Sequence, residues 1–163
     1  MLSHYNYETR LALHTNNPMP PFTRLTIPDL LLEEVIEHTR REAPIECCGL
    51  LAGRIENGVG IVTARFTVAN DLRSPTQYET NAHDLFTAFR AMRHDNLELL
   101  AIYHSHPTSE PVPSRRDVEQ NTYGESVIHL IVSLAKEKPT VRAWCLMGDG
   151  YREAEWGISE GPR

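Results

Sequence analysis

LLAIYHSHPTSEPVPSRRD, residues 99–117, is the stretch that decides the fold. Its first five residues are apolar and predict a buried strand, which runs directly into His104-Ser105-His106. Residues two apart in a strand point to the same face, so His104 and His106 are expected to converge on one point. Pro107 cannot donate to a sheet ladder and is expected to end the strand there.

A helix is expected to begin after the polar loop that follows. Ser114 is a candidate N-cap, and Asp117 comes three residues later, in the first helical turn. The strand end thus carries two imidazoles and the helix start carries a carboxylate. Two His and one Asp form a three-ligand zinc set that leaves the fourth position for water, which is the catalytic rather than the structural arrangement.

Two blocks of the sequence resemble a known enzyme family. The first is His104-Ser105-His106-Pro107 followed, after six residues, by Ser114-Arg115-Arg116-Asp117, which resembles the signature of the JAMM (MPN-positive, Mov34/PAD-1) metalloproteases. The second is PIECCGLL, residues 44–51, which resembles the upstream block of that family and puts Glu46 in its catalytic place. The resemblance extends over residues 25–156.

The resemblance implies a mechanism and a substrate class. One zinc ion per chain would be held by His104, His106 and Asp117, and Glu46 would take the proton from the zinc-bound water and deliver it to the leaving amine. Ser114 would donate a hydrogen bond to the oxyanion, in addition to or instead of acting as a plain N-cap. The scissile bond would be a peptide or isopeptide bond after the C-terminal tail of a ubiquitin-like protein. The chain is compact and resembles the small prokaryotic members, which implies a ubiquitin-like sulfur-carrier substrate.

The composition fits one cytoplasmic globular protein. The chain has 163 residues, 40% of them hydrophobic and 23% charged, and it has no apolar run long enough to cross a membrane. We also expect no signal peptide. The net charge of −6 argues against a nucleic-acid partner. We therefore expect neither nucleic acid nor a membrane as partner, and a homodimer is left open.

The three cysteines, Cys47, Cys48 and Cys145, do not form a disulfide framework. They are expected to be reduced and mostly buried, although a bridge from Cys47 or Cys48 to Cys145 is left open. Among the histidines, His83 and His94 are expected to face solvent. His129 lies within an apolar run and is expected to be a core residue rather than a metal ligand.

The pattern along the chain predicts an α/β fold with a mixed, curved β-sheet flanked by helices, which is also what the resemblance to MPN and cytidine-deaminase-like folds implies. We expect a flexible arm at 1–21, a single domain at 22–157 and a loose tail at 158–163. The expected elements are a strand at 22–27, a helix at 28–42, a hairpin of strands 48–52 and 59–69 turning at Asn57-Gly58, a helix capped by Thr80 or Asn81, the strand at 99–106, a short helix from 114 to about 120, and strands at 125–134, 141–147 and 151–156.

Three other functions compete with the peptidase. A non-catalytic MPN scaffold that binds partner proteins is the main alternative, but such domains usually lack the zinc ligands that are present here. A zinc nucleoside deaminase needs H-x-E and P-C-x-x-C blocks, and neither occurs. A cysteine hydrolase using Cys47 or Cys48 has no support beyond the residue type, and the H-E-x-x-H string of other metalloproteases is absent.

Overall fold

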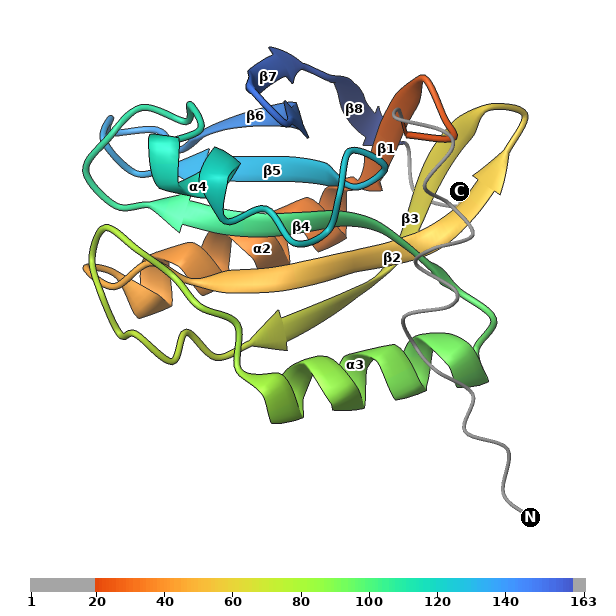
Figure 1. The fold of residues 1–163 in the computed structure, drawn as a ribbon, viewed down its shortest axis with the longest axis horizontal. Coiled ribbons are helices and arrows are strands. Elements are labelled where there is room, and N and C mark those ends of the chain that lie inside the picture. Colours follow the sequence, from red (N-terminus) through yellow and green to blue (C-terminus); the bar gives the residue numbers. More distant parts are fainter. Residues whose placement is uncertain (1–19, 160–163) are drawn as a thin grey trace.

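A computed structural model describes residues 20–159 of the chain. These residues form one sheet of eight strands in the order β7-β6-β5-β4-β2-β3-β1-β8, with helices on both faces (Figure 1). Parallel and antiparallel neighbours both occur, so the predicted α/β fold with a mixed, curved sheet is confirmed. The elements are β1 (Arg24–Pro28), α2 (Asp29–Glu42), β2 (Cys48–Glu56), β3 (Val59–Val68), α3 (Ala82–His94), β4 (Glu98–His106), α4 (Arg115–Glu119), β5 (Ile128–Ser133), β6 (Thr140–Met147), β7 (Gly150–Glu153) and β8 (Glu155–Ser159).

The two faces of the sheet bury separate hydrophobic cores. Side chains alternate along the central strands β2 and β4, so Leu51 and Ala101 pack into the core on the α2 side. Their neighbours Leu50 and Ile102 pack into the core on the α3 side. Strands buried on both faces are continuously apolar, which is why residues 99–102 carry no polar side chain.

Local sequence signals set the ends of the elements. Helix α2 ends at Glu42, just before Ala43 and the following proline, as predicted. Asn81 rather than Thr80 caps α3, because its side chain accepts a hydrogen bond from the backbone N–H of Asp84. The β2–β3 hairpin turns at Asn57 and Gly58, both with positive φ, as the Asn-Gly pair predicts.

The terminal strand predicted at 151–156 is wrong, because the segment forms two strands at opposite edges of the sheet. Strand β7 pairs with β6, whereas β8 pairs with β1, and only Ala154 separates them. The sheet is therefore curved so strongly that its two edges come together, as Figure 1 shows for β7 and β8. The backbone N–H of Ala154 donates to the carbonyl of Ala143 at this junction.

The predicted division into arm, domain and tail remains a prediction for the ends of the chain. Most of the predicted arm, residues 1–19, lies outside the described residues, as do residues 160–163. The predicted tail begins too early, because Ile158 and Ser159 belong to β8 and pair with β1.

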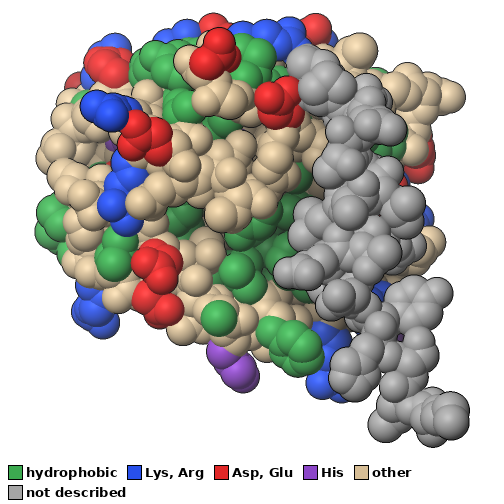
Figure 2. Space-filling model, viewed as in Figure 1, with side chains coloured by type: hydrophobic (Ala, Val, Ile, Leu, Met, Phe, Trp, Pro, Cys, Tyr) green, Lys and Arg blue, Asp and Glu red, His purple; other side chains and the backbone are tan. Residues whose placement is uncertain are grey.

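Several composition-based expectations can be compared with the structure. All three cysteines are buried and none forms a disulfide. Within residues 20–159, no helix is both long and apolar enough to cross a membrane. Acidic and basic side chains are interspersed on the face shown in Figure 2, and the basic side chains do not gather into one continuous patch there.

Candidate metal centre

Two buried imidazoles face each other at the end of β4. His104 is fully buried and His106 is 5% exposed. Their side chains leave the same face of the strand, and the Nε2 atoms lie 3.2 Å apart. The predicted convergence of the two side chains is thus present in the structure.

Asp117 reaches this pair from the first turn of α4. Ser114 is the N-cap, and it forms a capping box with Asp117: the Ser114 hydroxyl accepts from the backbone N–H of Asp117, and the backbone N–H of Ser114 donates to the Asp117 carboxylate. The Asp117 carboxylate lies 3.5 Å from Nε2 of His104 through Oδ1, and 3.7 Å from Nε2 of His106 through Oδ2. A helix cap therefore fixes the third candidate ligand.

The spacing of these three side chains fits a metal ion. Ligand nitrogens bound to tetrahedral zinc at 2.0–2.1 Å are about 3.3 Å apart. The separations of 3.2, 3.5 and 3.7 Å among the donor atoms of His104, His106 and Asp117 match that geometry. Of the described residues, these three form the one group of His, Cys, Asp or Glu side chains with such convergence. Two imidazoles and one carboxylate also leave a coordination position for water or substrate.

Glu46 lies beside the triad, two residues before the start of β2. Cys48 pairs with His104 in the antiparallel register of β2 and β4, so continuing that register sets Glu46 opposite His106. Cys47, which lies between, exchanges hydrogen bonds with Ser105: its N–H donates to Oγ and its carbonyl accepts from the Ser105 N–H. Burial raises the pKa of Glu46 to about 8, with Asp117 adding to the rise and His106 opposing it.

Hydrogen bonds hold the candidate ligands in states that suit a cation. Burial alone would raise the pKa of Asp117, but its contacts with His104 and His106 hold that pKa well below its usual range. His106 lies with Nδ1 2.7 Å from the carbonyl of Glu110. Since a carbonyl only accepts, Nδ1 of His106 carries a proton, which leaves Nε2 of the neutral ring to bind a metal ion.

Ser114 has two roles in the structure already. Besides capping α4, its hydroxyl donates to Oδ2 of Asp117 at 2.7 Å. A hydroxyl has one proton to donate, so in this arrangement that proton orients the Asp117 carboxylate.

Asn70 is a residue that the sequence reasoning missed. It opens the loop between β3 and α3, and its side chain makes four hydrogen bonds. The Nδ2 group donates to the carbonyls of Glu46 and Gln77, at 2.9 Å each, and Oδ1 accepts at 3.0 Å from each of the N–H groups of Leu72 and Glu79. Every donor and acceptor of the amide is used, so Asn70 joins the backbone at Glu46 to the loop.

The same loop carries Tyr78 onto a proposed metal ligand. Its ring stacks on the imidazole of His104, with centroids 4.7 Å apart and planes 27° apart. The only sequence signal for the contacts of Asn70 and Tyr78 was weak: a polar loop that follows an apolar strand. Nothing in the sequence identified which residues of that loop turn inward.

A small pocket lies next to Asp117, between this loop, α4 and β5. It has a volume of about 80 Å³, and Tyr78, Arg116, Tyr123 and His129 contribute to its wall. The Nε atom of Arg116 is buried without a hydrogen-bond partner, as are both ring nitrogens of His129. Burial lowers the pKa of His129 to about 3, so this imidazole is uncharged.

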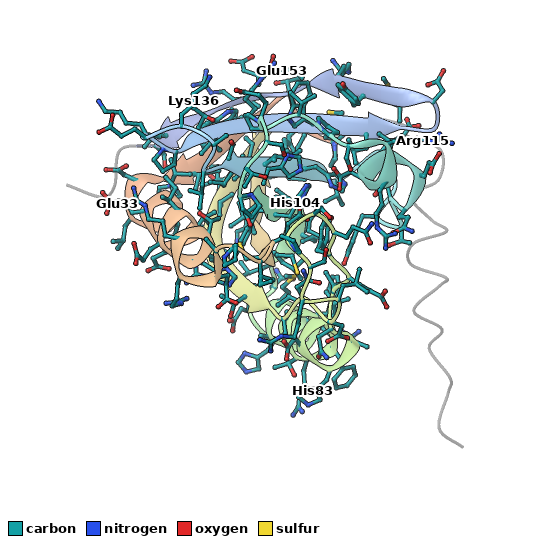
Figure 3. All side chains as sticks on the ribbon, turned by 90° about the vertical axis from the view of Figure 1, so that its left-hand side faces the viewer. Glu33, His83, His104, Arg115, Lys136 and Glu153 are labelled. Atoms are coloured by element: carbon teal, nitrogen blue, oxygen red, sulfur yellow. The ribbon has the colours of Figure 1, made fainter. Side chains whose placement is uncertain are left out.

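The exposure of His83, His94 and His129 agrees with the predictions made for these three histidines. The side chains of His83 and His94 are 86% and 87% exposed on α3. In Figure 3, His83 points away from the body of the molecule, whereas His104 lies inside it. His129 is a core residue, 2% exposed.

Comparison with known proteins adds three named relatives. The chain is 34% identical over 125 residues to a desampylase of Pyrococcus furiosus, covering 77% of this chain and 83% of the relative. It is 42% identical over 97 residues to a probable TtuB-protein conjugate cleaving protease of Thermus thermophilus, covering 59% and 62%. It is 30% identical over 132 residues to a CysO-cysteine peptidase of Mycobacterium tuberculosis, covering 81% and 84%.

Solved structures and a family model agree with these relatives. A solution structure of a protein from Desulfitobacterium hafniense superposes with a TM-score of 0.75 at 31% identity, covering 85% of this chain and 93% of that one. The family model described as prokaryotic homologs of the JAB domain matches residues 28–146. The predicted resemblance to small prokaryotic JAMM proteins is thereby confirmed, and the chain belongs to the family of prokaryotic homologs of the JAB domain.

Proposed function

We propose that the chain is a zinc-dependent peptidase or isopeptidase that cleaves after the C-terminal tail of a ubiquitin-like or sulfur-carrier protein. The observation that carries the proposal is the convergence of His104, His106 and Asp117 with Glu46 beside them. At the level of the family the predicted hydrolase activity is confirmed, because the named relatives are a desampylase, a conjugate-cleaving protease and a CysO-cysteine peptidase. The alternative of a non-catalytic scaffold has no observation in its favour.

The residues of the triad would hold the metal, and Glu46 would move the proton. A zinc ion bound there would supply Lewis-acid chemistry, acidifying water and polarising the scissile carbonyl. Glu46 takes a proton from the attacking water and returns it to the leaving amine, so that the proton count balances at the end of the cycle. The raised pKa of the buried Glu46 carboxyl suits a group that must both accept and donate near neutral pH.

The oxyanion role of Ser114 requires a change of hydrogen bonding. Its hydroxyl proton is donated to Asp117 in the structure, so the hydroxyl must turn toward the substrate to stabilise a developing oxyanion. When a metal cation shares the Asp117 carboxylate, that oxygen is a weaker acceptor and the turn costs less.

Arg116 supports a substrate that approaches as an extended tail. Arg116 lines the pocket beside Asp117, and its Nε atom is buried without a hydrogen-bond partner among the described residues. A glycine-rich segment there would present backbone carbonyls that a guanidinium can bind. We propose that Arg116 contacts the tail of the carrier protein there. The carrier, a cytoplasmic location and a homodimer stay predictions.

The experiment that tests the proposal is the cleavage of a ubiquitin-like sulfur carrier that bears an adduct after its C-terminal diglycine. Wild type is compared with Glu46→Gln, and zinc content is measured for both. Glu42→Gln is the matched control, since Glu42 is exposed on the last turn of α2. Cleavage by wild type and the control but not by Glu46→Gln, with zinc in all three, supports the proposal. Equal cleavage by Glu46→Gln removes Glu46 from the mechanism, and no zinc with no cleavage favours the scaffold.

A further inference from the structure

Two side chains that the proposed chemistry does not use hold the loop between β4 and α4. The Ser133 hydroxyl, at the end of β5, donates to the backbone carbonyl of Ser109 at 2.5 Å. The indole N–H of Trp144, in β6, donates to the backbone carbonyl of Pro111 at 2.8 Å. Both side chains are buried, so water competes little for these bonds. The two bonds fix the residues on either side of Glu110.

The backbone carbonyl of Glu110, between the two held residues, faces a candidate metal ligand. It lies 2.7 Å from Nδ1 of His106, and it accepts from the backbone N–H of Val112 at 2.8 Å. The second bond closes a three-residue γ-turn around Pro111, which has no N–H of its own to satisfy. Both lone pairs of the Glu110 carbonyl are therefore used, and its direction depends on the path of the loop.

Packing adds to the hold that Trp144 has on this part of the chain. A small apolar cluster consists of Ile131, Trp144 and Leu146. Val112 of the loop and Val118 of α4 pack against this cluster. Loss of the whole ring would therefore disturb the loop and α4 together, whereas loss of the indole N–H alone acts on the carbonyl of Pro111.

The Glu110 carbonyl matters because the tautomer of His106 decides which ring nitrogen can bind a metal. An imidazole that binds through Nε2 carries its proton on Nδ1, and that N–H needs an acceptor. The Glu110 carbonyl is the acceptor here. Peptide units are rigid planes, so bonds to the carbonyls of Ser109 and Pro111 restrict the direction of the carbonyl between them.

We propose that Ser133 and Trp144 are positioning residues that hold the Glu110 carbonyl on Nδ1 of His106 and so keep His106 in the tautomer and ring orientation that bind the metal. The inference rests on the proposed function, because it assumes that His106 is a metal ligand. Neither Ser133 nor Trp144 is itself a ligand: each acts through a neighbouring carbonyl of the loop.

Zinc affinity, measured by competition with a chromophoric chelator, tests the proposal without relying on turnover. Ser133→Ala removes the hydroxyl, and Trp144→Phe removes the indole N–H but keeps an aromatic ring. Trp156→Phe is the matched control, since it makes the same change at a partly buried tryptophan that packs against the core on the α2 side. Lys136→Met is a second control, because it breaks an exposed 3.5 Å ion pair with the side chain of Glu110 and leaves the carbonyls untouched.

The dissociation constant for zinc is expected to rise about 10-fold in Ser133→Ala and in Trp144→Phe, and to stay within about threefold of wild type in the two controls. Nitrogen-15 NMR of the metal-free proteins, at an alkaline pH that keeps the imidazole neutral, reports the tautomer of His106. The Nδ1-protonated form is expected to dominate in wild type and controls and to be diminished in both test variants. A purely structural role would lower stability without changing this tautomer.

The outcomes that would overturn the inference are distinct from failure of the proposed function. Zinc affinity within about threefold of wild type in both test variants, with an unchanged tautomer of His106, overturns the inference alone, as does an equal loss of affinity in Trp156→Phe. A change confined to one variant removes the other residue from the assignment. If Trp144→Phe does not fold, Ser133→Ala decides by the same two measurements. A wild-type chain that binds no zinc overturns the proposed function, and the inference falls with it.

Discussion

The hydroxyl of Ser114 donates a 2.7 Å hydrogen bond to Oδ2 of Asp117, the residue that it also caps. One side chain thus starts α4 and orients a proposed metal ligand. Because Asp117 lies in the first turn, the helix N-terminus places positive partial charge near the carboxylate and favours its ionised form. The order of the motif, Ser114 first and Asp117 three residues later, follows from the geometry of a capping box.

The proposed metal ligands give the first prediction. His106→Ala and Asp117→Ala are each expected to lose bound zinc, because two ligands hold the ion far more weakly than three. Treatment of wild type with a chelator is expected to abolish cleavage, and added zinc to restore it. His83→Ala on exposed α3 is the control and should keep its zinc. Unchanged zinc content in both ligand variants, measured by atomic emission, would show that the assignment is wrong.

Ser114 can be tested so that capping and catalysis separate. Ser114→Ala is expected to lower stability by about 1 kcal/mol, whereas Ser114→Gly costs only a few tenths, because glycine is tolerated at the N-cap. If the hydroxyl turns to the oxyanion during the reaction, both variants lose about 100-fold in kcat with little change in KM. Chemical unfolding and steady-state kinetics of the two variants provide the comparison. A kcat close to wild type in Ser114→Gly would leave Ser114 as a cap and support for Asp117.

Asn70 is expected to act on turnover through the backbone at Glu46. Asn70→Asp keeps the two accepted hydrogen bonds but loses the two that Nδ2 donates to the carbonyls of Glu46 and Gln77. Displacing a catalytic group by a fraction of an ångström to 1 Å costs up to about 100-fold, so we expect kcat to fall by about 10- to 100-fold. The control is Asn96→Asp, an exposed loop position after α3 with the same change of charge. Equal kcat in the two variants would contradict the prediction.

Arg116 and Arg115 are adjacent cations with different surroundings. Arg115 is 89% exposed and pairs with Glu119, whereas Arg116 lines the pocket beside Asp117. If Arg116 contacts the tail of the carrier, Arg116→Met is expected to raise KM about 10-fold with kcat nearly unchanged, since a contact made equally in ground and transition states affects binding alone. Arg115→Met should leave both constants near wild type. Matching effects of the two variants would point to general electrostatic attraction instead.

The convergence of His104, His106 and Asp117 was predictable from sequence because each part of this candidate triad is a local pattern. A two-residue spacing at a strand end brings His104 and His106 to one face, and a cap followed by a first-turn acid positions Asp117. Only the contact between the histidine pair and Asp117 joins separate elements. Both lie within residues 99–117, and so short a segment allows few other arrangements. Glu46 was different: no local pattern distinguishes it from a surface charge, and its placement came from the family resemblance.

What the sequence did not reveal depends on contacts between distant segments. Asn70 and Tyr78 belong to a loop whose inward residues are fixed by contacts with distant strands: Asn70 bonds the backbone at Glu46, and Tyr78 stacks on His104, which no periodicity encodes. The separation of β7 from β8 at Ala154 depends on the curvature of the whole sheet, so a continuous run of strand-forming residues was interpreted as one strand. The unpartnered nitrogens of His129 also became visible only when its neighbours were placed.

The raised pKa of Glu46 predicts how the stability of the metal-free protein depends on pH. Burial raises this pKa from 4.5 in the unfolded chain to about 8 in the folded one, so between these values the folded state keeps a proton that the unfolded state has lost. The free energy of unfolding therefore falls as pH rises through this window, by on the order of 1.4 kcal/mol per pH unit from this group. Glu46→Gln has no such proton to lose.

Denaturant unfolding of chelator-treated wild type and Glu46→Gln at pH 5, 6.5 and 8 measures this effect directly. The variant is expected to gain stability relative to wild type as pH rises, with the largest difference at pH 8. Taking the difference between the two proteins cancels the titration of the groups that do not interact with Glu46. Adding zinc is expected to reduce the difference, since a cation at the triad favours the Glu46 carboxylate. Parallel stability curves for the two proteins would mean that Glu46 titrates near its ordinary pKa and is not desolvated in solution.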